Sequence, residues 1–179
     1  MLKLAKLTGL TAECKRMFLF PFFRRITQLS GDVCGKHVEI FITRSVQIST
    51  NMVARIKLNW ENETHFSAMR KGLGVALMKA LGRPIVKSEN VILDKKITFQ
   101  ADDVAFARKV FAYEEIRDKF DVLWSGKFTN GVLIVGQSSI FYHEPASILT
   151  RKKRERFVVA IDLLCDLYDI LYFYKRKIS

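Results

Sequence analysis

Cysteine is scarce in this sequence of 179 residues, and its three copies do not suggest a structural role. Cys14, Cys34 and Cys165 are an odd number, and no two of them stand at CxxC spacing. A chain of this length buries enough surface to fold without disulfides. We therefore expect free thiols and a cytoplasmic location, with Cys165 as a small buried hydrophobe in the apolar run 158–174.

Motifs for catalysis, metal binding and secretion are also missing. His37, His65 and His143 are far apart, and none has a second ligand at helical or turn spacing. No GxSxG or P-loop occurs, and Gly72-Leu-Gly74 lacks the third glycine of a dinucleotide-binding loop. Lysines near the N-terminus interrupt any signal-peptide core. We predict no catalytic residue, no cofactor and no metal site, in a protein that is not secreted.

The most apolar stretch, residues 157–174, has nearly the length of a membrane span but carries charge. Asp162, Asp166 and Asp169 lie within it. Each aspartate would cost about 2.5–3.5 kcal/mol near the bilayer centre, so we predict that this stretch does not insert. Their spacing places the three on one stripe of a helix, which predicts a solvated acidic face.

Hydrophobic periodicity predicts one α+β domain over residues 1–179, built on a mainly antiparallel sheet of about six or seven strands with two or three helices, the last one long. The polar segment Glu61-Asn62-Glu63 predicts a hairpin turn, and Asp102 or Asp103 should cap a helix that runs to about Trp124. We expect strands over 37–44, 52–60, 64–70, 96–101, 132–135 and 139–143, and helices over 2–10, 72–81, 102–124 and 151–177.

What the sequence has in excess is positive charge, with a formal net charge of +12. Such an excess attracts anionic surfaces and polymers. We interpret the protein as a non-enzymatic binding or adaptor module for an anionic surface, either the cytoplasmic (inner) membrane face or an acidic protein partner. The basic clusters predicted to bind this surface are Lys15, Arg16, Arg24, Arg25, Arg151, Lys152, Lys153, Arg154, Lys175, Arg176 and Lys177.

Two other classes of function are kept as alternatives. A nucleic-acid-binding accessory protein would use the same charge, with Tyr172-Phe-Tyr-Lys175 as a stacking surface, although no helix-turn-helix, RNP or zinc-finger pattern is present. An enzyme with an unfamiliar site is the third interpretation. The sequence leaves the oligomeric state open.

The apolar cluster Met17–Phe23 has two interpretations. It lies between the basic pairs Lys15-Arg16 and Arg24-Arg25, as in peripheral membrane anchors. The other interpretation, which we favour, makes its phenylalanines core residues beside a sheet.

Residues 96–111 resemble a signature of a bacterial family of domains of unknown function: a short strand, an acidic residue, and a helix with Ala-Arg and a hydrophobic pair. Residues 24–41 are similar to that family's paired-glycine turn, and residues 131–135 resemble its late hairpin. Its members often adjoin membrane segments, so the resemblance implies attachment at a membrane surface and assigns no activity. The matching positions in the signature are Phe99, Asp103, Ala107, Arg108 and Val110.

Overall fold

The computed structural model describes the backbone of residues 2–19, 22–44, 50–72, 84–126, 130–145 and 150–178, and the side chains of 3–12, 28–43, 50–72, 84–126, 130–145 and 150–176. Nine strands and five helices occur in this described part of the chain. In chain order they are α1 (Leu2–Thr8), β1 (Thr11–Leu19), β2 (Phe22–Val33), β3 (Lys36–Arg44), β4 (Thr50–Lys57), β5 (Phe66–Arg70), β6 (Ile85–Val86), α3 (Val91–Lys96), β7 (Ile97–Ala101), α4 (Val104–Phe111), α5 (Glu114–Trp124), β8 (Val132–Val135), β9 (Ser139–Pro145) and α6 (Arg151–Ile178).

All nine strands join one sheet in the order β1-β2-β3-β4-β9-β8-β5-β7-β6, and every neighbouring pair is antiparallel. The predicted α+β class and antiparallel sheet are confirmed, but the predicted counts of six or seven strands and two or three helices are too low. The hairpin of β1 and β2 was missed because charged pairs interrupt its apolar residues. The third omission, β6, is only two residues long.

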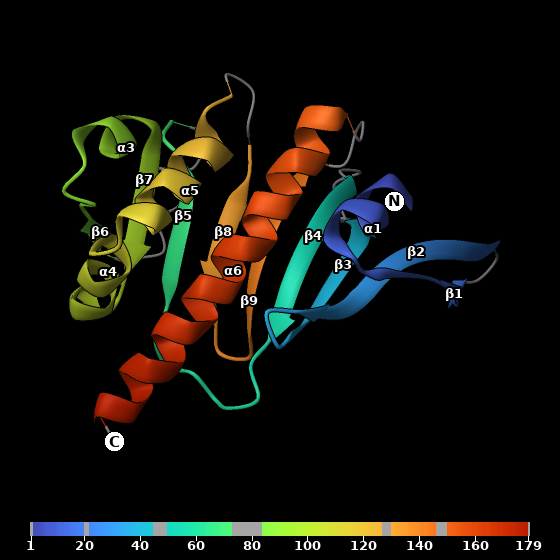
Figure 1. The fold of residues 1–179 in the computed structure, drawn as a ribbon, viewed down its shortest axis with the longest axis horizontal. Coiled ribbons are helices and arrows are strands. Elements are labelled where there is room, and N and C mark those ends of the chain that lie inside the picture. The colour runs from blue at the N-terminus through green and yellow to red at the C-terminus, as the bar shows by residue number, and fades with distance from the viewer. Residues whose placement is uncertain are drawn as a thin grey trace.

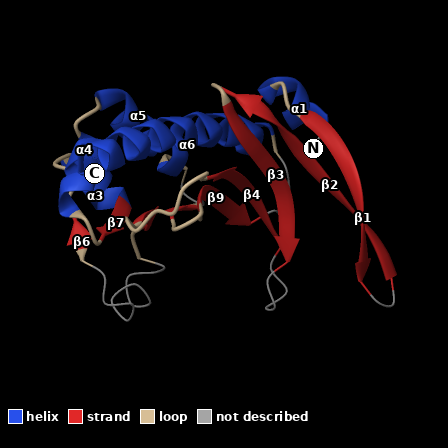
Figure 2. Cartoon of the chain, turned by 90° about the horizontal axis from the view of Figure 1, so that it is seen from below, coloured by secondary structure: helices blue, strands red, loops and turns tan. Residues whose placement is uncertain are grey.

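The described helices all lie on one face of the sheet (Figures 1 and 2), and α6 runs obliquely across its centre. Alternate residues of the strands point toward these helices, as the buried Leu133 and Val135 of β8 and Tyr142 of β9 show. The facing side of α6 is apolar, with Phe157 and Leu164 fully buried. The predicted long terminal helix is therefore confirmed, and it closes the core.

The helix expected over 102–124 is two helices. Asp103 caps α4 as predicted, since its Oδ1 accepts hydrogen bonds from the backbone N–H groups of Ala105 (2.9 Å) and Phe106 (3.0 Å). Tyr113 then has extended backbone (φ −92°, ψ 120°) and begins α5. The guanidinium of Arg117 donates to the carbonyl oxygen of Phe111 at the end of α4. The break was missed because the apolar periodicity continues through it.

The predicted hairpin between β4 and β5 is wrong, because β9 and β8 lie between these strands in the sheet. The connection instead crosses the β8–β9 turn. Nδ2 of the buried Asn62 donates to the carbonyl oxygen of Gly136 at 3.0 Å. The backbone N–H of Asn62 donates to the carbonyl oxygen of Gln137 at 2.9 Å. A polar segment expected to face solvent therefore makes buried hydrogen bonds.

Several local predictions hold, and two fall outside the description. Helix α1 ends at Thr8, directly before Gly9 with its φ of +70°, and β8 and β9 form the expected hairpin. Most of the helix predicted over 72–81 lies outside the described residues. Of the cluster Met17–Phe23, residues 17–19 lie at the end of β1 and residues 22–23 at the start of β2, where Phe18 pairs with Phe23. Their side chains are outside the description, so both interpretations of this cluster stay predictions.

Candidate anionic-surface site

The structure does not bring the predicted basic clusters together. Arg151–Arg154 form the first turn of α6 and Lys175–Lys177 lie in its last turn; at 1.5 Å per residue, the two ends of this 28-residue helix are about 40 Å apart. The β1–β2 hairpin, at the opposite edge of the sheet from β6 (Figure 1), carries the other four residues: Lys15, Arg16, Arg24 and Arg25. The side chains of those four residues and of Lys177 are not described.

Much of the basic charge at the start of α6 is used inside the protein. Arg151 Nε pairs with Glu155 Oε1 at 2.8 Å, and Lys153 donates to the carbonyl oxygen of Pro145. Arg156 Nη2 lies 3.1 Å from Oε2 of Glu144, a carboxylate that is only 1% exposed. The contacts of Lys153 and Arg156 hold α6 against the end of β9, whereas the Arg151–Glu155 pair lies within α6.

At the other end of α6, cations stand beside aromatic rings. We define the C-terminal aromatic–basic site as Asn59, Trp60, Tyr172, Phe173, Lys175 and Arg176. The ring of Trp60 lies 4.9 Å from that of Tyr168 and 5.5 Å from that of Tyr172, measured between centroids. A cavity of about 430 Å³ opens here, lined by Asn59, Trp60, Tyr172, Lys175 and Arg176.

The cations of this site are fixed by specific contacts. The guanidinium of Arg176 lies 5.3 Å from the ring centroid of Tyr172, a cation–π distance. Lys175 Nζ donates to the carbonyl oxygen of Glu61 at 2.6 Å, which ties α6 to the β4–β5 connection. Beside them, the side chain of Phe173 is 58% exposed. The last turns of α6 therefore carry an exposed aromatic ring and two cations.

Trp60 has one unsatisfied group. Its indole Nε1 is buried, and no acceptor for it occurs in the described part of the chain. A buried donor without a partner costs about 1–3 kcal/mol.

The acidic stripe of α6 is partly exposed, as predicted, but it also binds two lysines. Lys119 of α5 lies 2.6 Å from Asp162 and 2.5 Å from Asp166, and Lys36 of β3 lies 2.9 Å from Asp169. Burial lowers the pKa of each lysine, but the bonded aspartates outweigh this effect and raise it above its usual value. Sequence reasoning missed these pairs because each lysine comes from a distant element.

Among the described side chains, no group of three or more His, Cys, Asp or Glu residues could hold a metal ion. Cys165 is buried as predicted, and burial raises the pKa of its thiol to about 12, which keeps it protonated at neutral pH. Burial also lowers the pKa of His143 on β9. Searched over the same residues, no helix has the length and apolar character needed to cross a bilayer.

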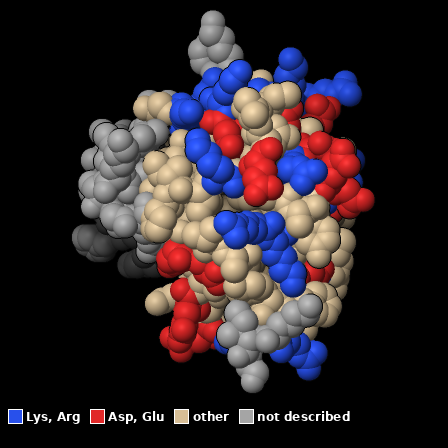
Figure 3. Space-filling model, turned by 90° about the vertical axis from the view of Figure 1, so that its left-hand side faces the viewer, with Lys and Arg blue, Asp and Glu red and all other residues tan. Residues whose placement is uncertain are grey.

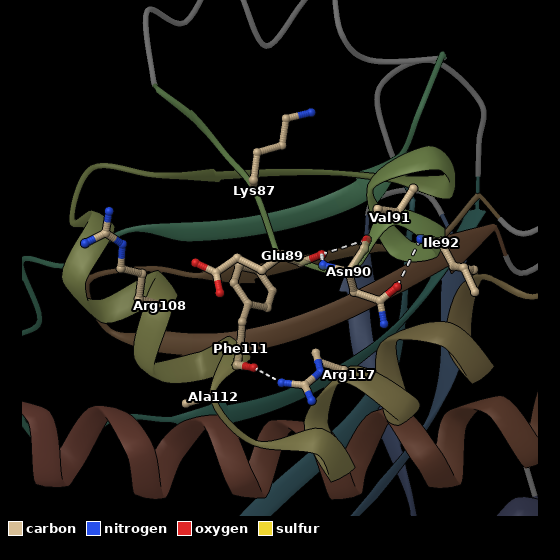
Figure 4. A pocket seen from close by; sticks show the side chains of 10 residues that line it. Lys87, Glu89, Asn90, Val91, Ile92, Arg108, Phe111, Ala112 and Arg117 are labelled. Atoms are coloured by element: carbon tan, nitrogen blue, oxygen red, sulfur yellow. Dashed lines mark hydrogen bonds between the residues drawn. The ribbon is translucent and has the colours of Figure 1, made fainter.

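A second, larger cavity was not foreseen from the sequence. It is a cleft of about 800 Å³ between the segment before α3 and the turn that joins α4 to α5 (Figure 4). Its cations do not form a run in the sequence, which is why charge clustering did not reveal it. It is lined by Lys87, Ser88, Glu89, Asn90, Val91, Ile92, Arg108, Phe111, Ala112 and Arg117.

Comparisons with known proteins give one likeness of fold. No protein-family model matches the chain, and no curated protein sequence matches it. Among solved structures, the crystal structure of the mycobacterial trehalose monomycolate transport factor A, TtfA, superimposes with a TM-score of 0.56 at 13% sequence identity. The match covers 94% of this chain and 90% of that chain, so the two proteins share an overall fold.

Proposed function

We propose that this domain is a non-enzymatic binding module that docks on an anionic membrane surface through the C-terminal aromatic–basic site. The observation that carries the proposal is an exposed phenylalanine, Phe173, whose ring lies 5.7 Å from that of Tyr172 in the same last turns of α6 that carry Lys175 and Arg176. Aromatic side chains favour the polar–apolar boundary of a bilayer, and basic residues are attracted to anionic headgroups.

The C-terminal aromatic–basic site fits the polar–apolar boundary of a bilayer better than the other basic clusters do. Lys175 and Arg176 would contact phosphate groups while Phe173 enters the region between headgroups and acyl chains. Each basic residue near an anionic leaflet contributes about 1 kcal/mol of binding free energy, and burying a phenylalanine side chain contributes about 1.5–3 kcal/mol. Together these terms suffice for reversible attachment of the kind made by peripheral proteins.

Vesicle flotation tests the proposal through the apolar residue. We expect the protein to float with vesicles of phosphatidylcholine mixed with phosphatidylglycerol, and to remain largely free with phosphatidylcholine alone. Phe173→Ser should weaken binding to the anionic vesicles about tenfold, because the inserted ring is lost. Raising salt from about 50 to about 150 mM should weaken it further, because the Debye length shortens.

The matched control is Val122→Ser, since Val122 on α5 is also an exposed apolar residue (47%) but lines neither cavity. Its binding should equal that of the unmodified protein. Equal recovery with neutral and anionic vesicles would contradict the proposal. The proposal would also be contradicted if the protein bound a duplex oligonucleotide more tightly than the vesicles and Phe173→Ser did not weaken that binding. That result would indicate the nucleic-acid alternative.

A further inference from the structure

The cleft beside α3 combines basic side chains with exposed apolar side chains. Lys87 and Arg108 make no ion pair or side-chain hydrogen bond within the described part of the chain, in contrast to Lys36, Lys96 and Lys119. Opposite them stand Val91 and Ile92, which are 68% and 61% exposed. These are the two most exposed large hydrophobic side chains among the described residues.

The basic side chains of the cleft are spread around it, whereas its exposed apolar side chains lie together. In Figure 4 the side chains of Lys87, Arg108 and Arg117 point in three different directions, and Val91 and Ile92 lie side by side, away from Arg108. One phosphate could not be held by cations that diverge in this way. A chain with several separate carboxylates and an apolar side chain matches the layout.

The wall of the cleft is held in place before any ligand arrives. Ser88 is 1% exposed, and both its hydroxyl and its backbone N–H donate to Oδ1 of Asp94, at 2.9 and 3.0 Å. Oδ1 of Asn90 caps α3 by accepting from the backbone N–H groups of Ile92 and Leu93. Glu89, between them, takes a left-handed backbone conformation with φ +61°. A wall fixed in this way loses little entropy on binding.

The neighbouring strand adds a backbone feature. The segment that forms this wall follows directly from β6, which is the last strand of the sheet. The outer edge of β6 therefore has no partner strand within the described sheet, and Ile85 on it is 44% exposed. An extended peptide beside such an edge can pair with its backbone and place alternate side chains in an adjacent pocket.

We propose that this cleft binds a short, extended acidic segment of a partner protein that carries apolar side chains. Carboxylates of the segment would pair with Lys87, Arg108 and the free donors of Arg117, and an apolar side chain would pack on Val91 and Ile92. The cleft carries three cations against the single carboxylate of Glu89, so it is complementary to negative charge. This site is separate from the membrane-facing one, and the domain would join an acidic protein segment to an anionic bilayer.

Fluorescence polarisation with a labelled peptide Gly-Asp-Leu-Asp-Asp-Leu-Asp-Gly tests the proposal on the full chain. We expect saturable binding that is lost when asparagine replaces the aspartates, and weakened when serine replaces the leucines. Arg108→Gln should raise the dissociation constant about fivefold, and Val91→Ser with Ile92→Ser about tenfold. Both substitutions are at exposed positions, and circular dichroism checks that the fold is kept.

The matched control for charge is Lys95→Gln, because Lys95 is an exposed lysine of α3 that does not line the cleft. It should change the dissociation constant by less than about twofold, the scale of a remote surface charge. Phe173→Ser should leave peptide binding unchanged, which separates this site from the membrane site. Absence of peptide binding would overturn the proposal, and so would an equal loss of peptide affinity with Lys95→Gln and Arg108→Gln. It would also be overturned if Arg108→Gln bound the peptide normally but lost vesicle binding.

Discussion

Packing against Tyr142 leaves no room for a side chain at Gly131. A Cβ at this position would lie 2.3 Å from Oη and 2.6 Å from Cε2 of the buried Tyr142, which is far inside van der Waals contact. Its carbonyl oxygen also accepts a hydrogen bond from Nε1 of Trp124 at 3.1 Å. Tyr142 and Trp124 both belong to the core, so neither ring has room to withdraw.

We therefore predict that Gly131→Ala lowers the free energy of unfolding by about 3 kcal/mol, the upper range for overpacking a core. Gly136→Ala is the control, because its Cβ would lie 3.5 Å from the nearest atom, an ordinary contact. It should change stability by less than about 1 kcal/mol. Urea unfolding of both variants measures the difference. Equal midpoints would show that Tyr142 can shift without cost.

Single residues were predictable where the cause is local. Asp103 as a helix cap follows from its position before an apolar helical pattern, and the burial of Cys165 follows from the run that contains it. Asn62 and Glu144 were not predictable, because each binds a residue of another element that only the tertiary fold brings near: Asn62 contacts Gly136 and Glu144 contacts Arg156. A polar residue becomes a buried one only when such a partner is present.

At the scale of elements, β9 and α6 are joined by a buried charge pair. Glu144 accepts from Arg156 Nη2 at 3.1 and 3.3 Å and from the hydroxyl of Tyr142 at 3.3 Å. The Arg156 side chain is 21% exposed, so the pair is partly screened by solvent. Removing only one charge would leave the other poorly solvated between a strand and a helix.

Glu144→Gln should destabilise the protein by about 2 kcal/mol, because the guanidinium of Arg156 then faces a neutral amide. Glu144→Gln combined with Arg156→Met should be less destabilised than the single variant, since no buried charge remains and Tyr142 keeps an acceptor. Thermal or urea unfolding of the two single variants and the double variant completes the cycle. Additive losses would indicate that the two side chains do not interact.

Most elements were predictable, but their neighbours in the sheet were not. Periodicity located β3, β4, β5, β7, β8, β9 and α6 because each has an apolar face. It could not show that β8 and β9 insert between β4 and β5, since sequence adjacency favours a direct hairpin. The candidate site depends on this arrangement, because the β4–β5 connection is what carries Trp60 and Glu61 to the end of α6.

For the whole molecule, the net charge of +12 is spread over separate regions. On the side that carries α3 and α4, basic and acidic side chains alternate over the surface (Figure 3). The two ends of α6 present different basic clusters about 40 Å apart. If α6 meets a flat bilayer end-on at its C-terminal turns, its first turn lies well beyond the Debye length, which is about 8–10 Å at physiological salt. The position of a basic residue should therefore affect vesicle binding more than the total charge of the protein does.

This argument gives a test in which total charge is held equal. Lys175→Gln with Arg176→Gln, and Arg151→Gln with Lys152→Gln, each remove two positive charges from the same formal total of +12. We expect the first pair to weaken binding to anionic vesicles by about thirtyfold, at about 1 kcal/mol for each lost cation. The second pair should stay within about twofold, because screening separates it from the bilayer. If both pairs weaken binding equally, the attraction comes from net charge alone, and the aromatic–basic end of α6 is not the docking site.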